Sequence, residues 1–411
     1  MVEESWQYMK KNIKITPEGT RDLLFEECLA RREAEGKLSD LFVCRGYSEV
    51  MTPEIEFYDV FDAMPMAVPS DGMYKLTDDK GRLLVMRPDN TMPIARLTAT
   101  RLQNAALPVR LYYAQDVYHL NHGLTGRNDQ QFQAGVELIG AAGKRADLEI
   151  LSLAAEAVRL FADGEETSFR IEIGHIGFFN ALIAALNVEQ EIQDDIRELI
   201  ESKNYAALSD KLNTLPADET VDAIRRLPRL FGGEEVLEKA RKLSRNAEAR
   251  QALDYLSGLY KTLCHLGLRD QVMIDLGMVH RNEYYTGVIF RGYVEGSGDA
   301  VVSGGRYDTL LQQFGSPLPA TGFGVNVDAL TKVMLDKGEV DPPMLPEALV
   351  FALPDQEAAA LKRVNDLIGE GMLCEFSIFD TLEETLEYAR QRQIPQVFAV
   401  KAEADTEVYE I

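Results

Sequence analysis

Apolar positions recur at two different spacings along the first 180 residues. Residues 19–45 and 144–161 carry them at intervals of three and four, which predicts two amphipathic helices. Residues 109–120 and 131–140 alternate apolar and polar side chains, which predicts two strands joined by a polar loop. Residues 72–91 predict a hairpin, because two apolar runs flank the turn sequence DDKG. This part of the chain therefore combines strands with helices.

The pattern changes from about residue 180 to residue 268, where charged, helix-forming sequence carries almost no strand signal. Just before this stretch, residues 169–179 predict a strand and a turn. After it, strand patterns return in four segments, the last of which leads into a helix: residues 272–279, 284–295, 299–311 and 321–335. The sequence consequently predicts an α+β fold, in which an antiparallel sheet is flanked by helices and interrupted by a helical insertion.

A separate module is predicted at the end of the chain. Residues 336–347 contain two proline clusters and predict a linker. Residues 348–411 then alternate apolar strands with two helices, which predicts a small α/β module. Residues 347–411 hold 14 acidic and 5 basic residues, which is an unfavourable balance for RNA binding. The expected domains are thus a core over residues 1–335 and this module.

The charge of the chain also argues against a nucleic-acid partner. The formal net charge is −24, whereas binding to a phosphate backbone depends on Lys and Arg. No apolar run is long enough to cross a membrane, and the first residues lack the features of a signal peptide, so the cytoplasm is the expected compartment. Four scattered cysteines predict reduced thiols, and the histidines form no recognised metal motif, so no metal is expected.

Six short motifs occur in an order that is typical of one enzyme family. They are GTRDLL, GYSEVMTPEIE, RPDNT, RLYY followed by GRNDQQFQAGVE, YYTGVIF and SGGRYD. In this order they resemble the catalytic core of histidyl-tRNA synthetase, a class II aminoacyl-tRNA synthetase, over roughly residues 15–335. The resemblance implies the class II fold and a homodimer formed around Gly46–Glu56. It also implies that the C-terminal module is a shortened anticodon-binding domain.

Seven residues match positions that line the amino-acid pocket of these synthetases: Asp89, Thr91, Gln133, Glu137, Tyr284, Tyr285 and Arg306. Gln133 and Glu137 are four positions apart on a predicted strand, so their side chains share one face. Carboxylate and amide oxygens suit an α-ammonium group, and a carboxylate or a phenol suits an imidazole N–H. The resemblance therefore implies a histidine site. Asp89 equally suits the N-cap of the helix that begins near Thr91.

The groups that hold ATP in the synthetases are replaced in this chain. Counted from the shared motifs, the replaced positions are His119, Asn121, His280 and Ala329, with Asp129 at a further basic position. Adenylation builds charge on a phosphate that preorganised cations stabilise, and losing one such group typically costs on the order of 10²–10³ in rate. The losses predict a protein without catalysis. Arg281, one residue beyond His280, would restore a cation only if the register shifted.

This combination resembles the regulatory subunits of ATP phosphoribosyltransferase, the first enzyme of histidine biosynthesis. They are histidyl-tRNA synthetase paralogues that lack aminoacylation, and ITPEGTRDLLFEEC and IEIGHIGFFNAL resemble them more closely than a synthetase. The resemblance implies a hetero-oligomer with a short-form catalytic phosphoribosyltransferase, histidine as feedback effector, and no cofactor. Two alternatives stay open. One is a divergent histidyl-tRNA synthetase, and the other is a free-standing histidine sensor or ligase.

Overall fold

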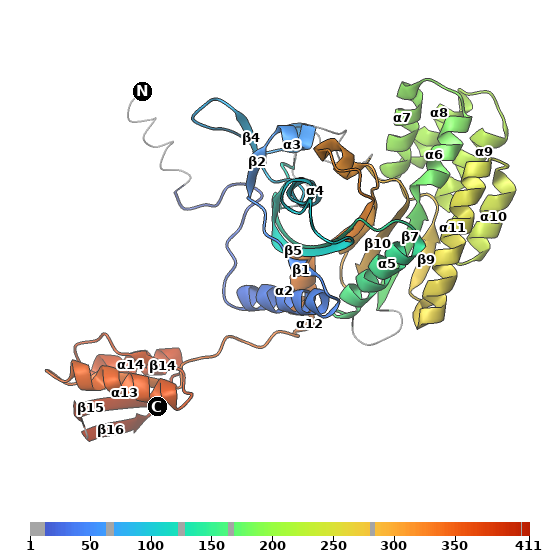
Figure 1. Cartoon of the computed structure of the whole chain (residues 1–411). Coiled ribbons are helices and arrows are strands. Elements are labelled where there is room, and N and C mark those ends of the chain that lie inside the picture. The colour runs from blue at the N-terminus through green and yellow to red at the C-terminus, as the bar shows by residue number, and fades with distance from the viewer. Residues whose placement is uncertain (1–12, 63–69, 122–127, 163–167, 280–283, 404) are drawn as a thin grey trace, which may run out of the picture. The chain divides into compact units, whose positions relative to one another are not determined.

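The structure is a computed structural model whose chain divides into two compact units, Met1–Val340 and Asp341–Ile411. The division falls inside the proline-rich segment 336–347. Each unit is described by itself, and Figure 1 shows the elements of both. The described residues are 13–62, 70–121, 128–162, 168–279, 284–403 and 405–411.

Nine strands form the large sheet of the first unit, in the order β1-β5-β6-β12-β11-β10-β7-β9-β8. Neighbouring strands are antiparallel except in the pairs β1–β5 and β7–β9. In spatial order the bounds are Ser48–Glu49, Val109–Tyr118, Gln130–Ile139, Ala320–Asn326, Val302–Arg306, Val288–Val294, Phe169–His175, Val272–Asp275 and Phe231–Gly232. The predicted antiparallel sheet is confirmed, with a parallel pair toward each edge.

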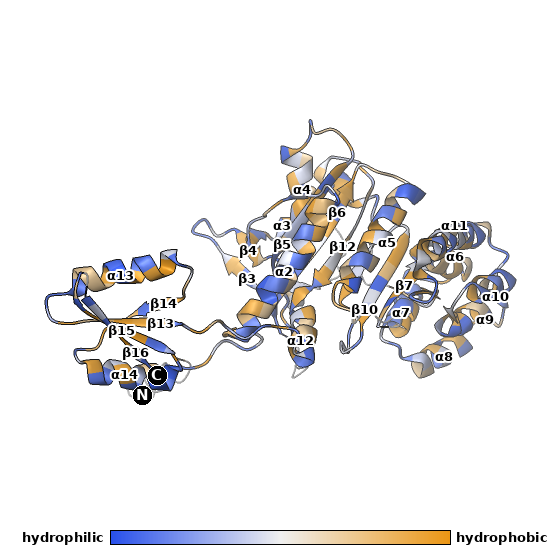
Figure 2. Cartoon of the chain, turned by 90° about the horizontal axis from the view of Figure 1, so that it is seen from below, coloured by the Kyte–Doolittle hydropathy of each residue, from blue (hydrophilic) through white to orange (hydrophobic). Residues whose placement is uncertain are grey.

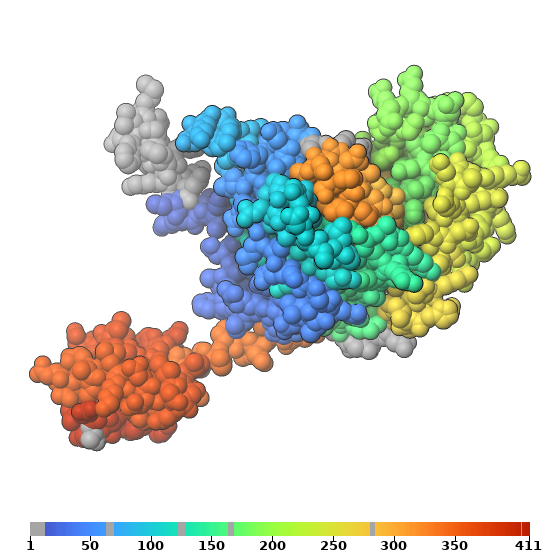
Figure 3. Space-filling view, in the orientation of Figure 1, coloured from blue at the N-terminus to red at the C-terminus, as the bar shows by residue number. Residues whose placement is uncertain are grey.

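Helices cover both faces of this sheet (Figure 1). The helices α2 (Glu26–Cys44), α5 (Lys144–Arg159) and α12 (Val327–Lys337) lie against one face, and α4 (Thr91–Arg101) lies on the other. Helix α2 buries Ala30, Ala34, Leu38 and Phe42, which recur every four residues and so form one stripe. Helix α2 begins at Glu26, seven residues later than the sequence pattern predicts. In Figure 3, residues around η4 (Leu310–Phe314) fill the surface between α4 and the helical insertion.

A second sheet of three strands lies beside α4. Its order is β2-β4-β3, with β2 at Ile55–Phe57, β4 at Leu83–Met86 and β3 at Lys75–Thr77. Strands β3 and β4 pair as antiparallel neighbours around the DDKG turn, so the predicted hairpin is confirmed. Two short helices flank the sheet, α3 at Asp59–Asp62 and the 3-10 turn η1 at Ser70–Gly72.

The helical insertion begins earlier than predicted. The turn expected at residues 176–179 is wrong, because Ile176 starts helix α6, which buries Phe178 and Phe179. The ring of His175 accepts the Gly177 N–H at 3.1 Å and caps this helix. The helices of this region are α6 Ile176–Ala185, α7 Gln190–Glu201, α8 Tyr205–Asn213, α9 Glu219–Arg226, α10 Glu235–Leu243 and α11 Ala247–Leu263.

The C-terminal unit is a four-stranded sheet with one helix packed on each face. The strand order is β14-β13-β15-β16, and only β16 is antiparallel to its neighbour. The bounds are β13 Ala348–Ala352, α13 Glu357–Gly369, β14 Cys374–Phe376, α14 Leu382–Arg392, β15 Gln396–Ala402 and β16 Asp405–Glu410. Strand β13 is buried on both faces, and Figure 2 shows its hydrophobic colouring between the two helices. These elements follow the alternation in the sequence.

Candidate functional site

Glycines in the central strands of the large sheet make room for two polar side chains of β6. A Cβ on Gly322 of β12 would lie 1.9 Å from the Glu137 carboxylate, and a Cβ on Gly324 would lie 2.7 Å from the Gln133 amide. Gly305 of β11 similarly lies under the ring of Tyr285. Glycine weakens a strand unless something approaches its backbone closely. The glycines therefore mark a built site, and Gln133 and Glu137 share its face as predicted.

Glu137 is the deepest group of this site, with 2% of its surface exposed. The pKa of Glu137 is raised to about 8, mainly by burial and to a smaller extent by the nearby Asp89. Hydrogen bonding from Tyr307 and Thr91 lowers it but does not cancel the burial. Among the described residues, no Lys or Arg forms an ion pair with Glu137. A buried acid beside a second acid is suited to a ligand that brings positive charge or an N–H donor.

Asp89 and Thr91 lie at the start of α4. Asp89 Oδ1 accepts the Met92 N–H at 3.0 Å, which is the capping role that the sequence left open. Burial raises the pKa of Asp89, although hydrogen bonds from the helix start oppose this. The Thr91 side chain serves both Asp89 and Glu137 as a hydrogen-bond partner. The two acids thus meet across one hydroxyl.

Tyrosine rings enclose the two acids. The rings of Tyr284 and Tyr285 lie 4.7 Å apart, and that of Tyr307 lies 5.7 Å from Tyr284 in an edge contact. Burial raises the pKa of Tyr285 well above its ordinary value, and the charges of Asp89 and Glu137 add to this effect. The phenols therefore stay protonated and supply donors and aromatic walls. We call Asp89, Thr91, Glu137, Tyr284, Tyr285 and Tyr307 the acid–tyrosine cluster.

Gln133 lies at the edge of this cluster within a chain of side-chain amides. Its Oε1 accepts hydrogen bonds from Asn90 Nδ2 at 3.1 Å and from the Tyr113 hydroxyl at 3.2 Å. Gln115, which lies directly opposite Gln133 on β5, donates to Asn90 Oδ1 at 2.8 Å. Asn90 is fully buried, and these contacts hold it between the two glutamines. The orientation of the Gln133 amide is therefore set by its neighbours.

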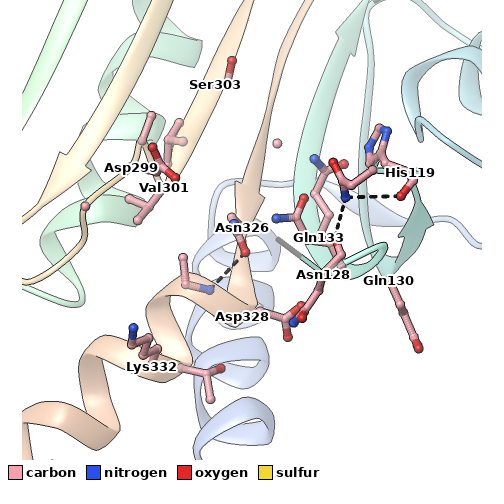
Figure 4. A pocket seen from close by; sticks show the side chains of 18 of the residues that line it. His119, Asn128, Gln130, Gln133, Asp299, Val301, Ser303, Asn326, Asp328 and Lys332 are labelled. Carbon is pink, nitrogen blue, oxygen red and sulfur yellow. Dashed lines mark hydrogen bonds between the residues drawn. The ribbon is translucent and has the colours of Figure 1, made fainter. Parts of the chain in front are cut away.

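Gln133 also lines a cavity of about 1410 Å³. Figure 4 shows Gln133 on β6 beside Asn326 at the end of β12, with Asp328 and Lys332 on α12. Among the described residues of the predicted histidine site, only Gln133 lines this cavity. His119, Asn121 and Ala329, at which the resemblance to the synthetases implies lost ATP contacts, line it too.

Two of the replaced positions, His119 and Asn121, are held together by Asp129. Asp129 accepts hydrogen bonds from the Tyr74 hydroxyl, the Asn121 N–H and the Asn121 amide, the last two at 3.1 Å. Burial raises the pKa of Asp129, but these bonds outweigh burial and leave the pKa below its usual range. Burial lowers the pKa of His119. This corner therefore carries an anion and a neutral imidazole where a phosphate clamp needs cations.

Of the two remaining replaced positions, Ala329 is among the described residues and His280 is not. Ala329 lies in the first turn of α12, and its N–H donates to the Asn326 side chain at 3.0 Å. A methyl group there offers no charge to the cavity. His280 and its neighbour Arg281 lie outside the described residues.

Arg306 is not brought into the acid–tyrosine cluster. Its guanidinium donates to Asp147 of α5 at 2.7 and 2.8 Å and to Asp308 at 2.8 Å. Asp147 also accepts the Tyr255 hydroxyl at 2.5 Å. Successive strand residues point to opposite faces, and Gly305 faces Tyr285, so Arg306 points toward α5 instead. Its contacts tie α5 to the sheet.

Several residues of the site were not found from the sequence. Asn90, Gln115, Tyr113 and Tyr307 stand within or beside the quoted motifs, but their roles depend on strand pairing. Within the described residues, no cluster of three potential metal ligands occurs, and the four cysteines are unpaired. None of the described helices is long and apolar enough to span a bilayer.

Comparison with known proteins identifies the family. A family model described as histidyl-tRNA synthetase matches residues 19–330. The ATP phosphoribosyltransferase regulatory subunit of Clostridium acetobutylicum is 39% identical over 388 residues, covering 94% of this chain and 95% of that protein. The Bacillus cereus regulatory subunit is 38% identical over 399 residues, covering 96% and 94%.

Solved structures agree with this assignment. A Bacillus halodurans crystal structure, titled an ATP phosphoribosyltransferase regulatory subunit/histidyl-tRNA synthetase, superposes with a TM-score of 0.80 at 29% identity and covers 95% of this chain and 99% of that one. A histidyl-tRNA synthetase from Nostoc, at 19% identity, shares the fold with a TM-score of 0.71 and covers 97% of this chain and 95% of that one. The chain therefore belongs to the family of ATP phosphoribosyltransferase regulatory subunits, built on the histidyl-tRNA synthetase fold.

Proposed function

We propose that the chain is a non-catalytic regulatory subunit of ATP phosphoribosyltransferase that senses histidine in the acid–tyrosine cluster. Its partner would be a short-form catalytic phosphoribosyltransferase, with which it forms a hetero-oligomer. Feedback is then a coupling free energy between histidine binding here and activity on the partner. The observation that carries this proposal is an intact buried acid site beside a former ATP corner that now holds Asp129.

The chemistry of histidine fits the cluster. An imidazole N–H requires an acceptor, and Glu137 with its surrounding phenols supplies one. An α-ammonium group requires carboxylate or hydroxyl oxygens, and Asp89 and Thr91 supply both at the start of α4. Binding a cationic group would also relieve the mutual repulsion of Asp89 and Glu137.

The same residues disfavour adenylation. A triphosphate in the cavity beside Gln133 would meet the methyl group of Ala329 and the side chain of Asn121, which is hydrogen-bonded to the carboxylate of Asp129. Like charge repels the phosphates, and a methyl group supplies no donor. The divergent-synthetase alternative needs another cation to fill this role, and the acidic composition of the C-terminal unit gives it no support.

An exposed apolar face supports a homodimer within the complex. On one face of the three-stranded sheet, Ile55, Phe57 and Leu76 are 49%, 42% and 39% exposed. They lie at or close to the segment Gly46–Glu56, around which the resemblance implies dimerisation. Such a face is stabilised when a second surface covers it.

Calorimetric titration of the purified chain with histidine, with and without the short-form enzyme, tests the proposal. Glu137→Gln should weaken binding at least tenfold, because an amide cannot ionise when a cationic or N–H-bearing group enters the site. Glu156→Gln, a change on the surface of α5, is the matched control and should bind normally. Histidine-dependent exchange of pyrophosphate into ATP would contradict the proposal, as would failure of the short-form enzyme to copurify or to gain activity.

A further inference from the structure

A buried hydrogen-bonded network connects the acid–tyrosine cluster to the helical insertion, with Arg306 at its centre. We propose that Arg306 transmits the binding of histidine from the cluster to the helices α6 and α11 of the insertion. The inference rests on the proposed histidine site and adds the element of the fold that responds to it. Arg306 is a positioning residue in this scheme, because it acts through its neighbours and not on the ligand.

On the cluster side, Tyr285 reaches Arg306 by two routes. Its ring lies on Gly305, the residue before Arg306, where a Cβ would be 2.8 Å from Cε1 of the ring. The next residue in the chain, Thr286, donates its N–H to the Arg306 carbonyl at 2.8 Å, and its hydroxyl accepts the Asp308 N–H at 3.0 Å. A displacement of Tyr285 by a ligand therefore acts on the backbone of both Gly305 and Arg306.

The side chain of Arg306 is fixed from several directions. Gly287 packs against its stem, where a Cβ would be 3.0 Å from Cδ. The guanidinium donates to Asp147 at 2.7 and 2.8 Å, to Asp308 at 2.8 Å and to the Ala141 carbonyl at 3.2 Å. A guanidinium is planar and its donors have fixed directions, so it cannot shift without changing these bonds together. Arg306 and Asp147 are 5% and 0% exposed, so water does not replace a bond that is lost.

On the insertion side, Asp147 connects Arg306 to α11. Its second oxygen accepts the Tyr255 hydroxyl at 2.5 Å. The ring of Tyr255 makes an edge contact with His175 at 5.7 Å, and the His175 ring caps α6. The N–H of Ile176, the first residue of α6, donates to the Gly287 carbonyl at 3.0 Å. The first and the last α-helix of the insertion therefore both contact this network.

A ligand that enters the acid–tyrosine cluster changes the packing of Tyr285. A buried polar network loses free energy when one bond is left unmade, so Arg306, Asp147 and Tyr255 adjust as a unit. Protein interiors are close-packed, and such an adjustment moves whole elements. Helix α5, which carries Asp147, contacts both β10 and α11 (Figure 1). The insertion is consequently the part of the chain that responds to histidine.

Tyr255→Phe tests the inference, because it removes one hydroxyl and keeps the ring against His175. In calorimetry on the full chain, the affinity for histidine should change less than twofold. In the complex with the short-form enzyme, the fold-inhibition at saturating histidine should fall about fivefold or more, since allosteric coupling typically amounts to about 5–150-fold. Hydrogen exchange in α6 and α11 should slow when histidine is added to the unmodified chain and should stay unchanged in Tyr255→Phe.

Tyr260→Phe is the matched control, because it removes a hydroxyl from the same helix at a position beside Gly233, outside the network. It should keep the inhibition and the exchange response. Thr286→Val removes the hydroxyl that accepts the Asp308 N–H, and it serves if Tyr255→Phe does not fold. It should weaken the inhibition too, and the double variant Tyr255→Phe/Thr286→Val should lose no more than the more affected single variant.

Unchanged inhibition and an unchanged exchange response in Tyr255→Phe would overturn the inference, as would an equal loss in Tyr260→Phe. Absence of histidine binding by the unmodified chain would overturn the proposed function itself. Calorimetry distinguishes the two failures, since the inference fails on its own only where histidine binds.

Discussion

Glu137→Gln should make the stability of the chain less sensitive to alkali. Gln mimics the protonated carboxyl group that Glu137 carries below pH 8, and it retains an acceptor for Tyr307. In the unfolded chain the Glu137 carboxyl group ionises near pH 4.5, whereas in the folded chain it ionises near pH 8. The folded state therefore holds a proton that the unfolded state has released, so stability falls as the pH rises through this window.

The size of this loss of stability follows from the pH range between the unfolded-state and folded-state pKa values of Glu137. Between pH 6 and pH 8 the folded chain loses about 1.4 kcal/mol per pH unit from this group, or about 3 kcal/mol in all. Above pH 8 both states are ionised and the loss levels off. Glu137→Gln removes this contribution, so the variant should gain about 3 kcal/mol on the unmodified chain between pH 6 and pH 9.

Urea unfolding at pH 6, 7, 8 and 9 measures this difference. The chain has two units, so the transition of the larger one is identified by its steeper dependence on urea, which scales with the surface exposed. Glu156→Gln on the surface of α5 should follow the unmodified chain at every pH. Parallel curves for the unmodified chain and Glu137→Gln would show that Glu137 ionises at an ordinary pKa and would refute the reasoning.

Three further outcomes are expected. Gly322→Ala should destabilise the chain by about 1–3 kcal/mol in urea unfolding and abolish histidine binding in calorimetry, because the new methyl group overlaps the Glu137 carboxylate. Asp147→Asn should destabilise it by about 3 kcal/mol, since it leaves the buried Arg306 without its main partner, while histidine affinity changes less than twofold. Restoring one cation by Ala329→Arg should not produce measurable pyrophosphate exchange, because Asp129 still opposes the phosphates.

The sequence predicted the elements whose signals are local. The hairpin of β3 and β4, the alternation of β6 and the C-terminal α/β pattern all depend on spacing within one segment, and the structure has them. Helix α6 was missed because its apolar residues continue directly from strand β7 without a break. Apolar runs of this kind carry no clear period.

The sequence predicted site residues whose placement depends on the alternation of side chains along their own strand. It did not predict residues whose role depends on the pairing of that strand with a neighbouring strand. Gln133 and Glu137 share a face because β6 alternates. Gln115 matters because the pairing of β5 with β6 sets it opposite Gln133, and a single sequence does not reveal that register. Arg306 matched a motif, but the alternation in SGGRYD, with Gly305 toward the cluster, directs it to the other face.

The contacts of Asp129 also limit which residues can replace it. Asp129 packs directly against Gly19, where a Cβ would be 2.3 Å from its carboxyl carbon, and its N–H donates to the Gly19 carbonyl at 2.7 Å. An Arg at this position would leave the Tyr74 and Asn121 donors without an acceptor, at about 1–3 kcal/mol for each donor that stays buried. Replacing Asp129 with a cation therefore costs stability before it supplies any contact to a phosphate.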